Sequence, residues 1–351
     1  MRCEPDLSVG SERRQSAGRN VRSGISLIEL LVSISVVGIL LALLVPAVIA
    51  ARDTARRVDC QNRIRQFGLA LHQFEQSYRH LPVGTIFDPR TGNSTPWRSP
   101  QVQLLPFLEQ AALFERIDKE PEMQVLHLGS TIELPAFHCP SESIATGVNY
   151  RACTGSNVGF FDEAGAEGEL ARGKGALAGV SSLTPIALSS ISDGLSNTAA
   201  MSERTISQMT RTAYDSKRDI WMTNAMSLGF DPEQRAADET VELCRAALSA
   251  PPVYYASSAG HNFVKDSYLY TGYNHVLTPN TAIPDCVLDR FAAESWPAAG
   301  LMVADWGAVG ARSLHRDGTV SLLMLDGSVR FVSSEIDTGA WRAFGSRSEG
   351  D

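Results

Sequence analysis

A single carboxylate, that of Glu29, lies near the start of a long apolar segment. Residues 30–51 contain no charged side chain, and about 20 such residues are enough to span a membrane as one helix. A charged side chain within a membrane helix costs about 2.5–3.5 kcal/mol on insertion scales, and those that occur there usually have a function. The chemistry expected of Glu29 is therefore the neutralisation of a cation in the same apolar environment.

The residues before the apolar segment form a second pattern. Arginines at positions 13, 14, 19 and 22 are followed by Gly24, Ile25 and, four residues later, Glu29. This register resembles the type IV prepilin signal, in which a basic leader is cut after a glycine and the new N-terminus is methylated. The resemblance implies that a prepilin peptidase/methylase cuts between Gly24 and Ile25. It also implies that the protein packs with other pilin-like subunits, with Glu29 neutralising the N-terminal amine of a neighbour.

Other interpretations of this segment stay open. An ordinary secretory signal has an apolar region of about 7–15 residues, which is shorter than this one. A plain membrane anchor matches the length but does not explain Glu29, unless its side chain snorkels to the membrane edge.

Charge on the two sides of the apolar segment predicts its orientation. Five arginines precede it, and Arg52, Arg56 and Arg57 follow it closely. Positive charge favours the cytoplasmic side, so the larger count predicts a cytoplasmic leader. We therefore expect a single-pass protein of the inner (cytoplasmic) membrane, in contact with lipid, with its remainder exported to the periplasm or cell surface.

The overall charge excludes one class of partner. The chain of 351 residues has a formal net charge of −8. Residues 1–24 carry five arginines and three acids, so the remaining 327 residues carry −8 − 2 = −10. Nucleic-acid binding needs a basic face, and we expect no nucleic-acid partner.

Hydrophobic spacing predicts an α+β fold with a pilin-like N-terminal helix. Apolar residues recur at intervals of 3, 4, 3 and 4, which predicts a buried helical stripe of Ile64, Phe67, Leu71, Phe74 and Tyr78. Apolar runs on both sides of Asp326-Gly327 predict a β-hairpin with a type I′ turn. The expected organisation is a leader (1–24), a transmembrane half-helix (25–51), a helical stem (52–81) packed on antiparallel strands, and a β-rich head (82–351).

Six cysteines, at positions 3, 60, 139, 153, 244 and 286, include one that leaves with the leader. An exported chain permits disulfides, although spacing alone does not determine which cysteines pair. Pairing within local loops predicts Cys139–Cys153 and Cys244–Cys286, with Cys60 free, and unpaired buried thiols remain the alternative. The chain has no C-x-x-C and its histidines are scattered, so we expect neither a metal nor another cofactor.

Several segments resemble the DUF1559 family of prepilin-like proteins. They are PAVIAARDTARR (46–57), GLALHQF (68–74), LLPFLEQ (104–110), HCPS (138–141), ISDGLSNT (191–198), YNHVLTPN (273–280) and DGSVR (326–330). The family also has a C-terminal His…Asp-Gly motif of unknown role, which corresponds here to His315, Asp326 and Gly327. Ten residues separate His315 from Asp326, where nine are usual, and the extra residue predicts either a shift of the strand's alternation or a bulge between them.

These features favour a structural function. Motifs such as G-x-S-x-G and H-E-x-x-H are absent from the sequence, and we expect no catalytic residues and no enzyme activity. The first hypothesis is a pseudopilin or minor pilin that packs by its N-terminal helix into a type IV pilus or a type II secretion-like assembly. The alternative is a membrane-tethered extracytoplasmic binding module that does not assemble. Assembly needs Glu29, whereas a tether does not.

Overall fold

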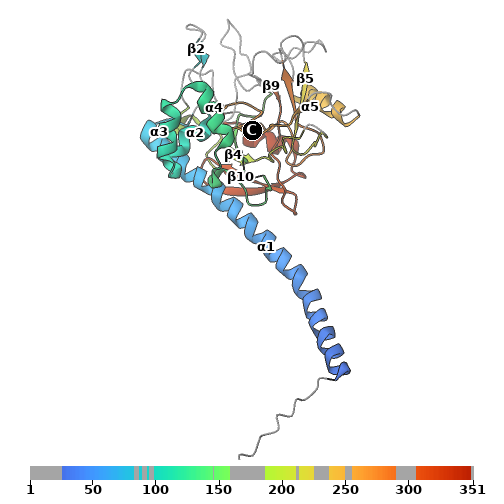
Figure 1. Ribbon diagram of the computed structural model, residues 1–351. Helices are drawn as coiled ribbons and strands as arrows, with labels where there is room; N and C mark the ends of the chain where they lie inside the picture. The colour runs from blue at the N-terminus through green and yellow to red at the C-terminus, as the bar shows by residue number, and fades with distance from the viewer. Residues whose placement is uncertain are drawn as a thin grey trace, which may run out of the picture. The chain divides into compact units, whose positions relative to one another are not determined.

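The computed structural model describes residues 26–82, 87–88, 93–94, 99–144, 146–158, 186–210, 213–224, 237–249, 255–289 and 306–348. Gly24 and Ile25, the expected processing site, lie outside these ranges. The chain divides into two compact units, residues 1–51 and residues 52–351. The fold is α+β, with a long N-terminal helix and a head of mixed and antiparallel sheets (Figure 1).

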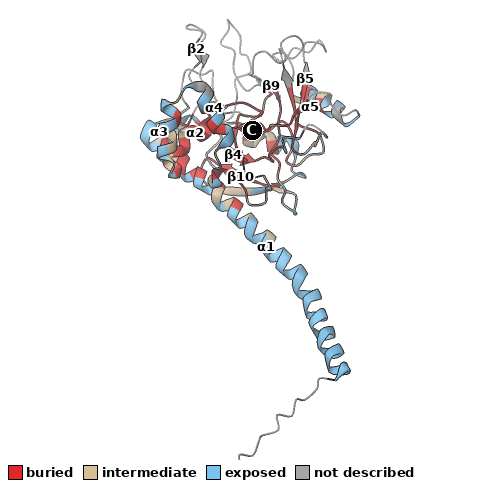
Figure 2. Ribbon diagram, in the orientation of Figure 1, coloured by how far each residue is buried: buried red, intermediate tan, exposed pale blue. Residues whose placement is uncertain are grey.

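Helix α1 (Leu27–Tyr78) contains 52 residues and begins in the first unit. Every residue from 26 to 51 is exposed, including the large aliphatic side chains (Figure 2). Among the described residues, α1 is the one helix long and apolar enough to cross a membrane, with a mean hydropathy of 2.8 over its most apolar 18 residues. An apolar surface of this kind is suited to lipid or to other apolar helices rather than to water.

In the second unit, α1 has one buried face. Four of the five residues of the predicted stripe are buried, namely Ile64, Phe67, Leu71 and Phe74. The prediction is wrong for Tyr78, which is 55% exposed. Tyr78 is the last residue of α1, and Arg79 has a positive φ of 63°, so the chain turns away there. The 3-4 spacing of apolar residues in the sequence therefore extends one helical turn beyond the part of α1 that packs against the head.

Short helices accompany α1 in the head. They are α2 (Pro100–Leu104), η1 (Leu105–Leu108), α3 (Ala111–Lys119), α4 (Glu122–Thr131), η2 (Pro135–Phe137), η3 (Leu188–Ser190), α5 (Ala237–Arg245), η5 (Ala246–Leu248) and α6 (Thr338–Gly345). Helices α2, α3 and α4 lie together on one side of the head, and α5 lies on the other side with β5 and β9 (Figure 1).

The main sheet has five strands in the order β11-β10-β4-β3-β7. Its members are β3 (Tyr150–Cys153), β4 (Ala199–Glu203), β7 (Gly272–Tyr273), β10 (Thr319–Met324) and β11 (Val329–Ser333). Neighbours pair antiparallel except β3 and β7, which are parallel. The pairing of β10 with β4 shifts register between Leu323 and Met324, inside the strand for which the sequence predicted a bulge.

A second sheet has four strands in the order β6-β5-β8-β9. Its members are β5 (Ile220–Asn224), β6 (Tyr255–Ala256), β8 (Cys286–Asp289) and β9 (Trp306–Ala308). Strands β5 and β8 are parallel, and the other pairs are antiparallel. A separate pair consists of β1 (Phe87–Asp88) and β2 (Asn93–Ser94).

Strands β3, β4 and β10 of the main sheet are buried on both faces, which explains the consecutive apolar residues 322–324 in β10. Leu323 belongs to the cluster that contains the buried face of α1, whereas Leu322 and Met324 belong to the cluster on the opposite face. Helix α1 approaches the sheet closely, since a Cβ added at Gly68 would lie 3.0 Å from Leu323 Cδ1.

The hairpin between β10 and β11 is present, but its turn differs from the predicted type I′. Gly327 N–H donates to the Met324 carbonyl at 3.0 Å, and Met324 N–H donates to Ser328 at 2.9 Å. Gly327 has a φ of 83°, and Asp326 is not among the residues with positive φ. The three-residue loop, closed by a left-handed glycine, allows Asp326 to keep an ordinary backbone conformation.

Candidate functional site

Ser26 and Glu29 form a capping box at the start of α1. Glu29 N–H donates to Ser26 Oγ at 3.3 Å, and the Glu29 carboxylate accepts bonds of 2.9 Å from both Ser26 N–H and Ser26 Oγ–H. These bonds satisfy backbone donors that have no partner within a helix. The Ser-x-x-Glu spacing in the sequence indicates such a box, and this local role adds to the charge-pairing role expected of Glu29.

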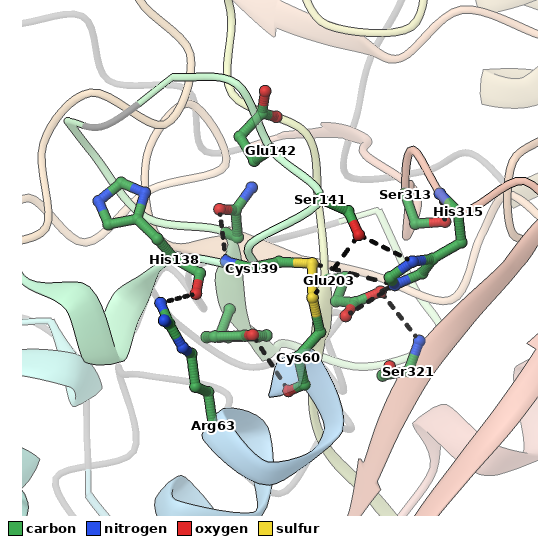
Figure 3. Close-up of a disulfide and its surroundings, with 12 residues drawn as sticks. Cys60, Arg63, His138, Cys139, Ser141, Glu142, Glu203, Ser313, His315 and Ser321 are labelled. Atoms are coloured by element: carbon green, nitrogen blue, oxygen red, sulfur yellow. Dashed lines mark hydrogen bonds and ion pairs between the residues drawn. A yellow bond between two sulfur atoms is a disulfide. The ribbon is translucent and has the colours of Figure 1, made fainter. Parts of the chain in front are cut away.

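A second candidate site lies inside the head, around Glu203 and His315. Glu203 is the last residue of β4, and His315 lies between β9 and β10. The Glu203 carboxylate is 3.0 Å from His315 Nε2 and accepts a bond of 3.1 Å from Ser321 N–H (Figure 3). On its other side, His315 Nδ1 lies 3.3 Å from Ser141 Oγ. The side chains of Glu203 and His315 are only 2% and 4% exposed.

A disulfide between Cys60 of α1 and Cys139 lies directly beside this pair (Figure 3). His315 Nε2 is 4.0 Å from Cys139 Sγ, and Ser141 Oγ is 3.9 Å from Cys60 Sγ. The donor atoms of Cys60, Cys139, Glu203 and His315 all lie within 4.8 Å of one another. Thiolate sulfur, imidazole nitrogen and carboxylate oxygen are the donors that zinc takes in proteins.

The Cys60–Cys139 disulfide corrects the predicted pairing of Cys139 with Cys153. Cys139 lies with Cys60 in the cluster on one face of the main sheet, whereas Cys153 lies in the cluster on the other face. A Cys139–Cys153 bond would have to cross the sheet. Cys153 is free and buried, and burial raises the pKa of its thiol to about 12.

The second predicted disulfide, Cys244–Cys286, is present in the structure. It joins α5 to β8, with a Cα–Cα distance of 5.4 Å. The first disulfide therefore ties α1 to the segment that follows η2, and the second ties α5 to a strand of the second sheet.

Two family models match the chain. Residues 49–339 match the model described as a protein of unknown function (DUF1559), and residues 19–45 match the prokaryotic N-terminal methylation motif. The chain belongs to the DUF1559 family. Neither a curated protein nor a solved structure matches it. The methylation motif identifies this DUF1559 protein as type IV pilin-like and implies that it is a substrate of a prepilin peptidase.

The structure does not bring together the parts of the DUF1559 His…Asp-Gly motif. His315 precedes β10 and contacts Glu203, whereas Asp326 and Gly327 follow β10 in the hairpin turn. Asp326 accepts a bond of 2.8 Å from Ser328 N–H, which supports the turn. Strand β10 therefore lies between His315 and Asp326, and the two residues have different surroundings.

Buried charges hold the backbone around Glu203 in this DUF1559 protein. Arg204 and Arg312 both bind Asp285, through contacts of 2.9 and 3.0 Å, and Asp285 is fully buried. Burial alone would raise the pKa of Asp285, but the charges of Arg312 and Arg204 outweigh it and lower the pKa. Arg312 N–H also donates to the Glu203 carbonyl at 2.8 Å. The network therefore fixes the segments on both sides of the Glu203–His315 pair.

The Glu203–His315 contact also changes the protonation of the histidine. Burial alone lowers the pKa of His315, but the hydrogen bond to Glu203 and its negative charge raise the pKa by more. His315 therefore stays protonated, and paired with the charge of Glu203, up to a higher pH than a histidine in water.

The cavity beside the disulfide is small. It has a volume of about 10 Å³, which is no more than one water molecule needs. Its lining includes Cys139, Ser141, Glu203 and Arg312. An organic substrate does not fit into a cavity of this size, whereas a single ion or water does.

Proposed function

We propose that this protein is a pilin-like structural subunit, a pseudopilin or minor pilin, that acts through association and not through catalysis. It is cut after Gly24 and packed by α1 into a type IV pilus or a type II secretion-like assembly. One observation carries the proposal: the methylation motif at residues 19–45 leads into a helix whose residues 26–51 are all exposed and largely apolar. Such a helix needs lipid or neighbouring helices around it.

The same features support a location. One membrane-length helix fits a membrane-anchored protein with an exported head. We place the anchor in the inner membrane and the head in the periplasm or at the cell surface. The expected partners are the prepilin peptidase/methylase, other pilin-like subunits and membrane lipid.

Glu29 supplies the charge that association needs. A methylated Ile25 amine keeps its positive charge, and Glu29 is the only acid in residues 25–51. In a bundle of packed helices, the carboxylate of one subunit pairs with the amine of another. Removing one partner of a buried ion pair costs about 3–5 kcal/mol, because the other charge stays buried.

The capping box favours a second candidate, a membrane-tethered extracytoplasmic binding module that does not assemble. The bonds between Ser26 and Glu29 give the carboxylate a role within a single chain. Glu29 would then be needed to begin the helix, whether or not subunits associate. The two candidates predict different behaviour for variants at these two positions.

Three variants separate the candidates when crosslinking is measured in membrane preparations. Ser26→Ala removes the cap and keeps the charge, Glu29→Gln removes the charge and keeps a side chain able to cap, and Glu29→Ala removes both. If subunits associate, crosslinking falls strongly for Glu29→Ala, falls less for Glu29→Gln and stays near wild type for Ser26→Ala. Equal yields in all variants contradict assembly, and a loss in Ser26→Ala equal to that in Glu29→Ala assigns Glu29 to capping.

Processing has its own test. Intact-mass spectrometry of the protein extracted from membranes should show the loss of residues 1–24 and the added mass of a methyl group on Ile25. Replacing Gly24 with leucine should leave the leader attached. Cleavage near Ala50 instead would remove the helix on which the whole proposal depends.

A further inference from the structure

The pilin-like role does not explain why Glu203 and His315 lie beside the Cys60–Cys139 disulfide. We propose that reduction of this disulfide creates a binding site for one Zn²⁺ ion, with Cys60, Cys139, His315 and Glu203 as ligands. The disulfide and the metal site are alternative states of one cluster. The inference concerns the head alone and does not depend on whether subunits assemble.

The donor set and its compactness support the site. Two thiolates, one imidazole and one carboxylate complete the four ligands of a tetrahedral zinc ion. All four donor atoms already lie within 4.8 Å of one another. Tetrahedral bonds of about 2.0–2.3 Å place ligand atoms about 3.3–3.8 Å apart, so only small movements are needed. The sulfurs move apart, and the histidine and carboxylate move inward.

The surroundings hold His315 and Glu203 in the orientation that ligands need. A histidine that binds a metal through one nitrogen usually has its other nitrogen hydrogen-bonded. Here His315 Nε2 points to Glu203 and Cys139, and Nδ1 lies 3.3 Å from Ser141 Oγ (Figure 3). Ser321 N–H holds the carboxylate at 3.1 Å. Asn149 accepts a bond of 3.1 Å from Cys139 N–H, which fixes the backbone of that cysteine.

The cavity supplies space and access on the Cys139 side. It is lined by Cys139 and Glu203 and is large enough for about one water molecule. Cys60 is fully buried, whereas Cys139 is 6% exposed, so a reductant reaches Cys139 first. The same cavity brings an ion to the ligands after the sulfurs separate.

The chemical steps balance without any group beyond a reductant and the ion. A dithiol gives two electrons and two protons to the disulfide and becomes a disulfide itself, which leaves Cys60 and Cys139 as thiols. The ion then replaces the two thiol protons, which are released. The imidazolium of His315 also releases its Nε2 proton to solvent and keeps its Nδ1 proton, which can donate a hydrogen bond to Ser141 Oγ.

Both states attach α1 to the segment that follows η2. Cys60 belongs to α1, Cys139 follows η2, Glu203 ends β4, and His315 precedes β10. The disulfide links the first two of these segments, and the ion links all four. Residues 52–78 of α1 therefore remain attached to the head when the disulfide is reduced, provided that zinc is present.

The test uses the full chain in detergent, carrying Cys3→Ser so that the leader offers no thiol. A phosphine reductant opens the disulfides by taking the oxygen of water, and Co²⁺ then serves as a spectroscopic substitute for Zn²⁺. We expect one Co²⁺ per reduced chain, with the visible bands of a tetrahedral ion and a thiolate charge-transfer band. Zn²⁺ should displace Co²⁺, and the oxidised protein should give neither spectrum.

Matched variants assign the ligands. Cys60→Ser with Cys139→Ser should abolish the spectrum, whereas Cys244→Ser with Cys286→Ser, which removes the other disulfide, and Cys153→Ala should leave it unchanged. Ser141→Ala keeps all four donors and should weaken the affinity about 10-fold or more, as loss of a bond to a ligating histidine does. Bound Zn²⁺ should also protect Cys60 and Cys139 of the otherwise unaltered chain from alkylation, which avoids dependence on any variant's folding.

Three results would overturn the inference. The first is a reduced chain that binds no Co²⁺ in tetrahedral form. The second is an unchanged spectrum when Cys60 and Cys139 are both serine. The third is alkylation of Cys60 and Cys139 at the same rate with and without Zn²⁺.

Discussion

The two parts of α1 differ sharply, although they belong to one continuous helix. Residues 26–51 are exposed throughout and apolar on all sides, whereas residues 52–78 have one buried face and one polar face. The first part has no partner surface within the described residues of its own unit, and lipid and other pilin-like subunits are the partners proposed for it. The second part has its partners in the head. We therefore expect substitutions in the second part to change the stability of the head, and substitutions in the first part to change association.

The largest effect is expected at the buried face of the second part. Phe67 is fully buried and lies 5.4 and 5.8 Å from the rings of Phe137 and Tyr150. Phe67→Ala should lower the free energy of unfolding of the head by about 3–5 kcal/mol, because it leaves a cavity. Denaturation of the full chain in detergent, followed by tryptophan fluorescence, measures this change.

Two substitutions at exposed positions of α1 serve as controls for Phe67→Ala. Leu69→Ala lies on the exposed face of the same helix, where Leu69 is 61% exposed, and Leu41→Ala lies in the first part. Both should leave head stability within about 0.5 kcal/mol of wild type. A large loss in Leu41→Ala would show that the apolar half stabilises the head, and the separation of the two parts would fail.

A somewhat smaller effect is expected from loss of the disulfide that fixes α1 to the head. Replacing Cys60 and Cys139 with alanine removes a link across 79 residues and should cost about 2–4 kcal/mol under oxidising conditions. The matched change, Cys153→Ala, removes a free thiol and should cost less. Urea denaturation measures both, and peptide mapping without reductant checks the pairing. Recovery of a peptide that joins Cys139 to Cys153 would contradict the structure.

Acid should affect the head and leave the first part of α1 helical. Burial lowers the pKa of His275 to about 3, and its ring is stacked on Trp341 at 3.9 Å. The unfolded chain takes up the proton near pH 6.5, so the contribution of His275 is present above that pH and is lost as the pH falls toward 3. Between pH 6.5 and pH 5 the loss should be about 1.5 kcal/mol.

The comparison of wild type with His275→Gln isolates this contribution from other acidic groups. The variant should show a shallower fall in unfolding free energy over the same pH interval. Far-UV circular dichroism should retain the signal of the apolar helix after tryptophan fluorescence reports loss of the head. Equal pH slopes in the two proteins would remove His275 as the cause.

Much of the architecture follows from local patterns in the sequence. The apolar run predicted the membrane-length part of α1, and the 3-4 spacing predicted burial of Ile64, Phe67, Leu71 and Phe74. The apolar runs around Asp326-Gly327 predicted the hairpin, although not its turn type. Ser26 and Glu29 show that a local signal can also be overlooked, since their spacing alone indicates a capping box.

The candidate site in the head could not be predicted in this way. Glu203 and His315 are separated by 112 residues, and neither has a neighbour in the sequence that indicates the other. The same is true of Cys60 and Cys139. Their contact depends on how β3, β4 and β10 are ordered in the sheet and on which face α1 covers. Spacing favoured Cys139–Cys153 because it carries no information about the sheet that separates them.

Features that depend on a few neighbouring residues could be predicted from the sequence, namely an apolar helix with one acid, its amphipathic continuation and a C-terminal hairpin. Periodicity reports these features because side chains at fixed intervals share one face of a helix or strand. Tertiary structure alone decided that Tyr78 is exposed, that Cys60 pairs with Cys139, and that His315 meets Glu203. These outcomes depend on distances between segments that are remote in the chain, and only the packing of α1 on the main sheet sets those distances.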